Sequence, residues 1–334
     1  MSAEWNWRKH TGGPAIEFQG YTDFSSMAPV RGLVRETIQN AFDAQRDGAG
    51  GPPKMSFKFD TVSDAVRDKY LNKKLTKHLE AGLVVKGDDH GHLYESLRDH
   101  KKATWSEELT ILEVSDRNTT GLNGDITKTI AGWKPDPNNV FRQFHHAWGV
   151  SDGDTTRGGS WGYGKAVTPF ASKIKTFFAL SVRDKLTSKK PDLDYSLMGQ
   201  SIIKNHHLPF KDDLWLWHGY YSIQDTSPGK KDLALTSSEL TEVNQFITDF
   251  NIQDRALTDD DRGLSLIIPY PKDDITMVEI GKEVLINYIH LLLSGNLEVE
   301  LIDTRTGDTW NLVSTNCLQW LDKKDAIHGA LLGW

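Results

Sequence analysis

The sequence predicts an α/β fold in which one layer of helices covers one sheet. Segments with the 3.6-residue period of an amphipathic helix alternate with short runs of strand length along most of the 334 residues. No repeat of fixed period occurs, and no long low-complexity linker divides the chain. This length suffices for one large domain or two modest ones with a sizeable core.

The expected elements follow from local patterns. The strands share apolar or alternating runs bounded by turn-forming residues, and we expect them at residues 55–60, 109–114, 174–182, 196–204, 219–224, 263–269, 297–303 and 309–313. The helices share apolar positions three or four residues apart, and we expect them at residues 30–47, 65–81, 138–148, 165–172, 237–250 and 278–294.

Two of these helices have clear boundaries. Val34, Ile38 and Ala41 recur at helical spacing, and the sequence GAGGPP that follows ends the first helix. Ser237 or Ser238 is the expected N-cap of the later one.

A domain boundary is expected near residue 271. It separates a first domain, residues 1–271, from a C-terminal α/β extension, residues 272–334. The extension is the shorter of the two parts.

Composition excludes several classes of protein. The hydrophobic share is 38%, the charged share is 25% and the net charge is −7, which argues against a surface that coats nucleic acid throughout. No run approaches the roughly 20 apolar residues of a membrane span, and the N-terminal residues MSAEWNWRKHTGG contain no apolar core of signal-peptide length. Cys317 is the single cysteine, so an internal disulfide is impossible. A reducing, cytoplasmic setting fits these features.

The sequence ETIQNAFDA, beginning at Glu36, is the first candidate for chemistry. On a helix Glu36, Asn40 and Asp43 share one stripe, roughly opposite the apolar one. The carboxylate can take a proton from water, and the neutral Asn oxygen can hold Mg²⁺ beside phosphates without adding charge. The alternative is an amphipathic helix with an ordinary polar face.

The sequence LEVSDRNTTGLNG, beginning at Leu112, is the second candidate. An apolar strand delivers Asp116 into a turn, where its carboxylate can accept a hydrogen bond from an exocyclic amine such as adenine N6. Gly121 would let the backbone come close to the base. The alternative is an Asx-turn at the end of a strand.

The sequence RGGSWGYGK, which ends at Lys165, is the third candidate. Its four glycines free backbone amides to face a polyphosphate, and Lys165 adds a positive charge. It is not a Walker loop, because Ala166 stands where Ser or Thr is required. The alternative is a generic flexible loop.

Together and in this order, the three sequences resemble the Bergerat nucleotide-binding fold of the gyrase, Hsp90, histidine kinase and MutL (GHKL) superfamily. There a helix with ExxxNAxDA precedes a strand with DxGxG, a glycine-rich lid and a closing strand, which here is GLSLIIP. The resemblance covers roughly residues 20–270, and Asn118 replaces the first glycine of the second pattern. It implies that the short extension at residues 272–334 is a reduced or truncated transducer-like domain. The variant DRNTTGL and the lid GGSWGYGK look most like MORC-type ATPases and bacterial relatives linked to anti-phage defence.

The resemblance implies a role for each matching residue. On the helix, Glu36 would be the general base, Asn40 would bind Mg²⁺, and Asp43 would support the same helix face. At the base, Asp116 would recognise adenine, Asn118 and Gly121 would lie beside the base, and Thr176 would assist Asp116 through a water. Around the phosphates would lie Gly158, Gly159, Gly162 and Gly164, with Lys165 at the γ-phosphate.

The resemblance also implies an ATPase that acts as a conformational switch. ATP with Mg²⁺ would order the lid, residues 149–165, and drive formation of a homodimer. An N-terminal arm, residues 1–25, would pack Trp5 and Trp7 against the partner. A nucleic-acid-related or defence role, with DNA or a partner protein as client, is expected. Two alternatives stay open: a kinase of the histidine-kinase type and a nucleotide-sensing module with little turnover.

Overall fold

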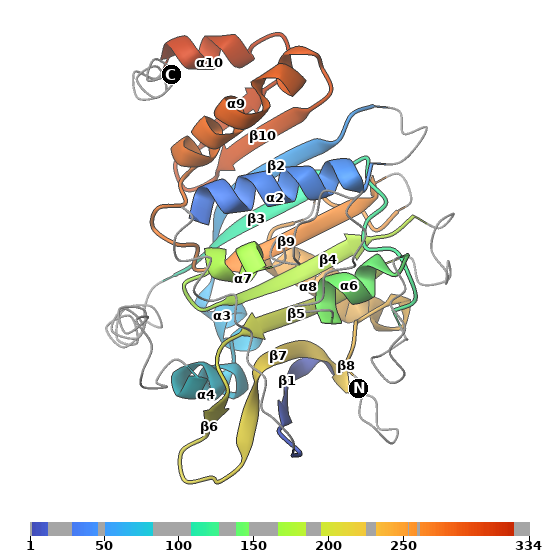
Figure 1. Ribbon diagram of the computed structural model, residues 1–334, viewed down its shortest axis with the longest axis vertical. Helices are drawn as coiled ribbons and strands as arrows, with labels where there is room; N and C mark the ends of the chain where they lie inside the picture. Colours follow the sequence, from blue (N-terminus) through green and yellow to red (C-terminus); the bar gives the residue numbers. More distant parts are fainter. Residues whose placement is uncertain are drawn as a thin grey trace.

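The computed structural model shows a mixed α/β chain built on one large sheet (Figure 1). The structure describes residues 2–12, 29–45, 51–82, 108–126, 138–146, 166–184, 195–224, 232–252, 254–258 and 261–323. Statements about the fold refer to these ranges.

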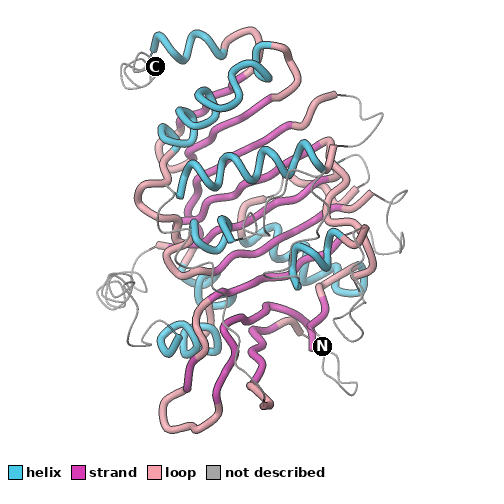
Figure 2. The backbone as a smooth tube through the Cα atoms, viewed as in Figure 1, coloured by secondary structure: helices cyan, strands magenta, loops and turns pink. Residues whose placement is uncertain are grey.

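Eleven strands of the described ranges join this sheet (Figure 2). They are β1 (Glu4–Lys9), β2 (Lys54–Val62), β3 (Leu109–Arg117), β4 (Thr176–Val182), β5 (Tyr195–Ile202), β6 (His206–His207), β7 (Leu214–Gln224), β8 (Asp232–Leu233), β9 (Gly263–Pro269), β10 (Glu298–Asp303) and β11 (Asp308–Leu312). Their order is β1-β7-β5-β4-β9-β3-β2-β10-β11, with β6 and β8 paired to β7. β10 runs parallel to β2, and the other neighbours run antiparallel.

The helices lie between these strands in the chain. They are α2 (Pro29–Asp43), α3 (Asp64–Tyr70), α4 (Lys73–Gly82), α6 (Val140–His146), α7 (Val167–Ala171), α8 (Leu240–Asp249), α9 (Met277–Leu293) and α10 (Cys317–Lys323), with a 3-10 turn, η2 (Ser237–Glu239), before α8. Among the described residues, no helix is both long and apolar enough to cross a membrane.

Every expected strand is present, and three strands were not predicted. The unpredicted strands are β1, β6 and β8, and α10 is an unpredicted helix. The expected helix at 65–81 is in fact two helices, because the Asn72 side chain accepts hydrogen bonds from the Lys74 and Leu75 amides and so begins α4 anew. The expected N-cap, Ser237 or Ser238, is wrong: both serines lie in η2, whose N-cap Thr236 forms a capping box with Glu239, and Glu239 is the N-cap of α8.

Helices cover both faces of the sheet, so the expectation of a single helical layer is wrong. Along β4, Phe177 and Ala179 face the cluster formed with α2 and α9, whereas Phe178 and Leu180 face the cluster formed with α3, α4 and α8. All seven residues of β4 are buried. A strand that is apolar at successive positions needs cover on both sides, and this rule predicts the second layer.

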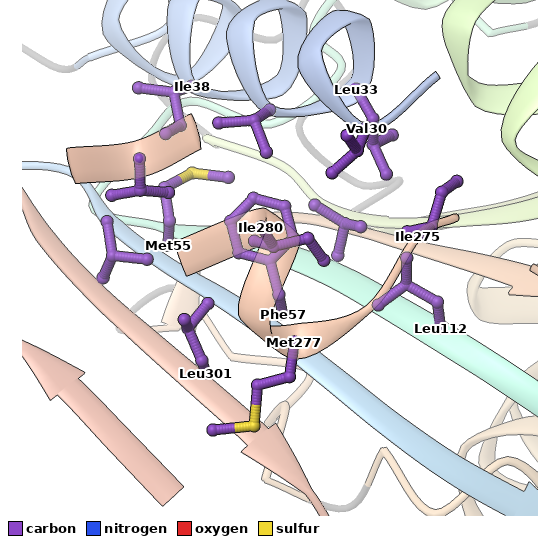
Figure 3. Close-up of a cluster of buried hydrophobic side chains, with 14 of the residues drawn as sticks. Val30, Leu33, Ile38, Met55, Phe57, Leu112, Ile275, Met277, Ile280 and Leu301 are labelled. Carbon is purple, nitrogen blue, oxygen red and sulfur yellow. The ribbon is translucent and has the colours of Figure 1, made fainter. Parts of the chain in front are cut away.

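The first of these clusters combines α2 and β2, from the N-terminal part of the chain, with α9 and β10, which follow residue 271. Leu33 and Ile38 of α2 pack with Phe57 of β2, Ile280 of α9 and Leu301 of β10 (Figure 3). All five side chains have no exposed surface, and each such burial stabilises the fold by about 1.5–3 kcal/mol. The residues that follow the expected boundary at 271 therefore continue the same sheet and the same core.

The N-terminal strand β1 is integrated into the chain's own fold. It pairs with β7 at one edge of the sheet, and Trp5 has no exposed surface while Trp7 is 6% exposed. The Trp5 indole donates a hydrogen bond of 2.7 Å to the carbonyl of Tyr70. The expectation that Trp5 and Trp7 pack against a partner is therefore wrong for this fold, because both rings are already buried among neighbours of their own chain.

Candidate functional site

A pocket opens between α2, α7 and the sheet. Its wall combines an apolar floor with a few polar groups, as is typical of small-molecule sites. The lining residues are Thr37, Asn40, Met55, Val114, Asp116, Phe144, Val167, Thr168, Leu264 and Leu266. Asn40 and Asp116 come from two of the three candidate sequences, and the fold brings them to one cavity.

Helix α2 contributes Thr37 and Asn40 to this pocket. The Thr37 hydroxyl donates a hydrogen bond to the carbonyl of Leu33 at 2.7 Å, so this donor already has its acceptor within α2. The Asn40 side chain is exposed, and among the described residues nothing hydrogen-bonds to it. Its neutral amide oxygen is therefore available to a ligand or to a hard cation.

Glu36 lies one turn before Asn40 on the same stripe of α2. Its side chain is half-buried and does not itself line the pocket. Burial raises the pKa of the Glu36 carboxyl, the charge of Arg35 acts in the opposite direction, and the charge of Asp43 raises the pKa further. A carboxyl with a raised pKa is better matched to accepting a proton from water near neutral pH. Asp43, the last residue of α2, is exposed.

Asp116 lies near the end of β3 with one carboxylate oxygen already held. Oδ1 accepts hydrogen bonds from the Thr119 hydroxyl at 2.5 Å and from the Leu264 amide at 3.1 Å. No described residue donates to Oδ2, so that oxygen can accept from a ligand. Burial raises the pKa of the Asp116 carboxyl, while the Thr119 hydrogen bond and the charge of Arg255 lower it.

Asn118 and Gly121 shape the turn after β3 and do not line the pocket. Asn118 adopts a φ of 62° and donates to the Pro52 carbonyl at 2.8 Å. Gly121 has a φ of 64°, and a Cβ at this position would lie 2.4 Å from the Val182 carbonyl oxygen. The backbone at Gly121 therefore approaches β4 closely, and this approach is what requires a glycine. The sequence had suggested that the glycine allows an approach to a base.

The role expected of Thr176 is wrong. In the sheet register, Leu264 is opposite Ser181 of β4, and the Leu264 amide is the group that holds Asp116. Thr176 lies five residues earlier, about 16 Å along the strand. It also shares its face with Phe178, on the side of the sheet away from the pocket. Ser181 is the β4 residue opposite Leu264, and its hydroxyl accepts from the Leu122 amide at 2.8 Å.

The glycine-rich sequence lies outside the described residues. This applies to Gly158, Gly159, Gly162, Gly164 and Lys165, and to the rest of the expected lid at 149–165. The description resumes at residue 166, and α7 begins one residue later. Val167 and Thr168 of α7 line the pocket.

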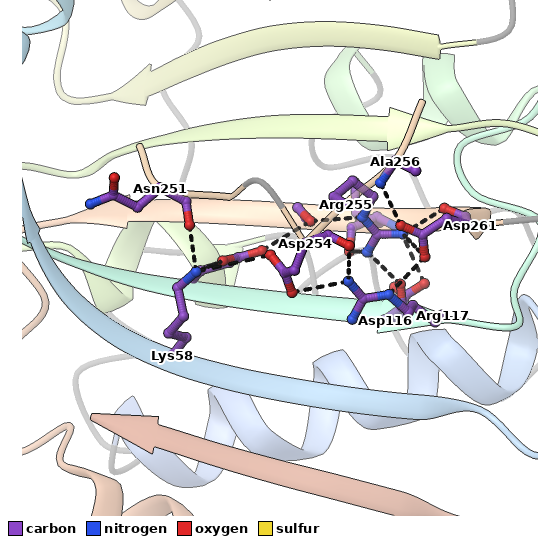
Figure 4. Close-up of polar contacts among 11 residues, drawn as sticks. Lys58, Asp116, Arg117, Asn251, Asp254, Arg255, Ala256 and Asp261 are labelled. Atoms are coloured by element: carbon purple, nitrogen blue, oxygen red, sulfur yellow. Dashed lines mark hydrogen bonds and ion pairs between the residues drawn. The ribbon is translucent and has the colours of Figure 1, made fainter. Parts of the chain in front are cut away.

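A buried polar network supports Asp116 from the other face of the sheet (Figure 4). Arg255 donates to the Asp116 carbonyl at 2.6 Å and to the Ser265 hydroxyl at 3.1 Å. Ser265 donates to Glu113 at 3.2 Å, and the Lys58 ammonium lies 3.2 Å from the second oxygen of Glu113. Sequence reasoning missed this network. The sequence feature that could have indicated it is Glu113, which lies inside the apolar run LTILEV. A carboxylate buried in such a run needs a polar or charged partner.

Metal binding at this pocket would depend on the ligand. Among the described residues, no three His, Cys, Asp or Glu side chains converge as a metal site. Asn40 could contribute one oxygen to Mg²⁺, and the remaining ligands would be water and the oxygens of a bound phosphate.

The sequence matches no protein-family model, and no curated protein matches it significantly.

Proposed function

We propose that this chain binds ATP with Mg²⁺ in a Bergerat-type site and hydrolyses it. The observation that carries the proposal is that Asn40 of α2 and Asp116 of β3 line one pocket. Its other wall is α7, which follows the glycine-rich sequence directly. Helix α2, the end of β3 and helix α7 thus line one cavity, and this arrangement supports the resemblance to the GHKL superfamily.

Asp116 would read the base. Oδ1 is held by Thr119 and Leu264, which leaves Oδ2 to accept a hydrogen bond from an exocyclic amine. Adenine offers such a donor at its position 6, whereas guanine carries an acceptor oxygen there. An ionised carboxylate accepts only, so it favours adenine over guanine.

The α2 side of the pocket would act on the phosphates. Asn40 would hold Mg²⁺ together with phosphate oxygens. Glu36, one turn away, would take the proton of the attacking water, a role that typically contributes about 10²–10⁴-fold in rate. The backbone amides of residues 158–164 and the ammonium of Lys165 would neutralise the triphosphate.

The wider role follows the same proposal. Binding of the γ-phosphate would order the lid and drive dimerisation, so that the chain acts as an ATP-driven switch. A nucleic-acid-related or anti-phage defence setting is proposed on the resemblance alone.

Hydrolysis is tested with Glu36→Gln and ATP labelled at the γ-phosphate. The variant should bind ATP but lose about 10²–10⁴-fold of the release of free phosphate. Glu300→Gln is the matched control, because Glu300 is a partly exposed carboxylate on β10 outside this pocket. Free phosphate from Glu36→Gln at the parental rate would remove Glu36 from the mechanism. Label found on the protein itself would indicate a kinase.

Base recognition is tested by calorimetry with Asp116→Asn. The amide offers a donor as well as an acceptor, so the preference for ATP over GTP should fall roughly tenfold or more. If ATP and GTP lose affinity equally, Asp116 does not read the base.

A further inference from the structure

The regular backbone pairing of β3 with β9 ends just before Asp116. Their paired register ends at Ser115 opposite Ser265, and Asp116 and Leu264 are the next residues on each strand. Both carbonyl oxygens accept from the same guanidinium nitrogen, because Arg255 Nη2 lies 2.6 Å from the Asp116 oxygen and 3.3 Å from the Leu264 oxygen. A side chain from outside the sheet therefore joins the two strand ends.

Arg255 is well suited to this task. It is 2% exposed, and its remaining nitrogens donate to the Ser265 hydroxyl at 3.1 Å and to the Asp261 carbonyl at 3.0 Å. The planar guanidinium offers donors in a fixed fork, so it can hold several acceptors at set distances. The ammonium of a lysine lacks this geometry.

The position of the carboxylate depends on the distance between the two strands. Leu264 accepts from Arg255 through its carbonyl and donates to Asp116 Oδ1 through its amide. Gly263 permits this close approach, because a Cβ there would lie 2.1 Å from the Asp116 carbonyl oxygen and 2.9 Å from Arg255 Nη1. Movement of β9 away from β3 would therefore withdraw a donor that orients Oδ1.

Arg255 also affects the charge of Asp116. Burial raises the pKa of this carboxyl, and the Thr119 hydrogen bond and the positive charge of Arg255 lower it. The guanidinium thus helps to keep the carboxylate ionised, and only the ionised form is purely an acceptor.

We propose that Arg255 is the positioning residue that determines base preference at this site, acting through Asp116 from the opposite face of the sheet. The proposal rests on the proposed function: Arg255 orients the acceptor that selects a purine with an amine donor at position 6, as in adenine. It makes no contact with the nucleotide itself.

The test compares Arg255→Lys with Arg117→Gln. Arg117 belongs to the same network, with ion pairs to Asp261 at 2.7 Å and to Asp254 at 3.0 Å, but it donates to no atom of Asp116. Arg255→Lys should reduce the ratio of ATP to GTP affinity about tenfold, the size expected when a charged hydrogen bond is lost. Lysine keeps the positive charge opposite Asp116, so this variant tests the fork geometry of the guanidinium and not its charge. Arg117→Gln should leave the ratio near the parental value.

A second readout needs no nucleotide. Hydrogen exchange of the Leu264 amide should be at least about tenfold faster in Arg255→Lys, because the strand end that carries this amide is released. Unchanged exchange and an unchanged affinity ratio in Arg255→Lys would overturn the positioning role. If the parental chain binds no ATP, the proposed function fails, and the exchange measurement alone then decides whether Arg255 holds the strand ends.

Discussion

Replacement of Gly263 by alanine should loosen both the fold and the candidate site. Gly263 has a φ of 148°, which side chains rarely adopt, and its added Cβ would lie 2.1 Å from the Asp116 carbonyl oxygen and 2.7 Å from Asp116 Oδ1. The backbone strain costs about 1–3 kcal/mol. The overlap forces β3 and β9 apart and costs about 1–3 kcal/mol more. We therefore expect Gly263→Ala to lower the free energy of unfolding by about 2–6 kcal/mol.

Gly295→Ala provides the matched control for this change. Gly295 also has a positive φ, 71°, but a Cβ there would meet no atom within 4 Å. This variant bears only the backbone strain, about 1–2 kcal/mol. Urea unfolding followed by circular dichroism gives both free energies. Equal losses in the two variants would refute the argument, because they would show that the contact between Gly263 and Asp116 carries no energetic consequence.

Three further changes test the energetics of the interior. Burial lowers the pKa of Lys175, whose ammonium lies over the Phe170 ring, well below its ordinary value. The unfolded chain therefore binds more protons up to about pH 10.4, and stability rises with pH in that window. Lys175→Met should raise the free energy of unfolding at pH 7 by about 1–3 kcal/mol. Urea titrations at pH 7 and 9 should also show a weaker dependence of stability on pH. A variant less stable than the parental chain would contradict this prediction. Burial lowers the pKa of His78, which lies 2.8 Å from a nitrogen of His206, to about 3. As the pH falls below about 6.5, the unfolded state binds a proton at His78 that the folded state does not bind, so the free energy of unfolding drops by up to about 1.4 kcal/mol per pH unit. In His78→Phe, the free energy of unfolding should therefore fall less between pH 7 and 4.5. Phe57→Ala should cost about 3–5 kcal/mol in the same assay, because the Phe57 ring has no exposed surface, and a loss below 1 kcal/mol would contradict its place in the core.

Several elements could be predicted because their signals are local. The stripe of Val34, Ile38 and Ala41 is buried on α2, and β9 spans the residues expected from the run GLSLIIP. Both patterns are complete within one element, so no knowledge of the partner surface is required. The strand β1 was missed because its polar and apolar alternation covers only Glu4–Lys9, and its pairing with β7 joins positions far apart in the sequence.

The candidate site shows where sequence reasoning stops. Asn40 and Asp116 could be selected from their own motifs, and they do share a pocket. Thr176 was selected in place of Ser181 because the choice depends on the register between β4 and β9, which the β4 sequence does not contain. Arg255 follows a helix on the opposite face and carries no motif.

By itself, the sequence determined the alternation of helices and strands, the polar stripe of α2, and the placement of Asp116 near a strand end. These features are periodic or punctuated within a few residues, so local sequence encodes them. Only the tertiary structure decided that both faces of the sheet are covered, that Ser181 lies opposite Leu264, and that Arg255 joins the ends of β3 and β9. Each of these depends on contacts between residues distant in the chain, and the whole fold sets the register and packing that create them.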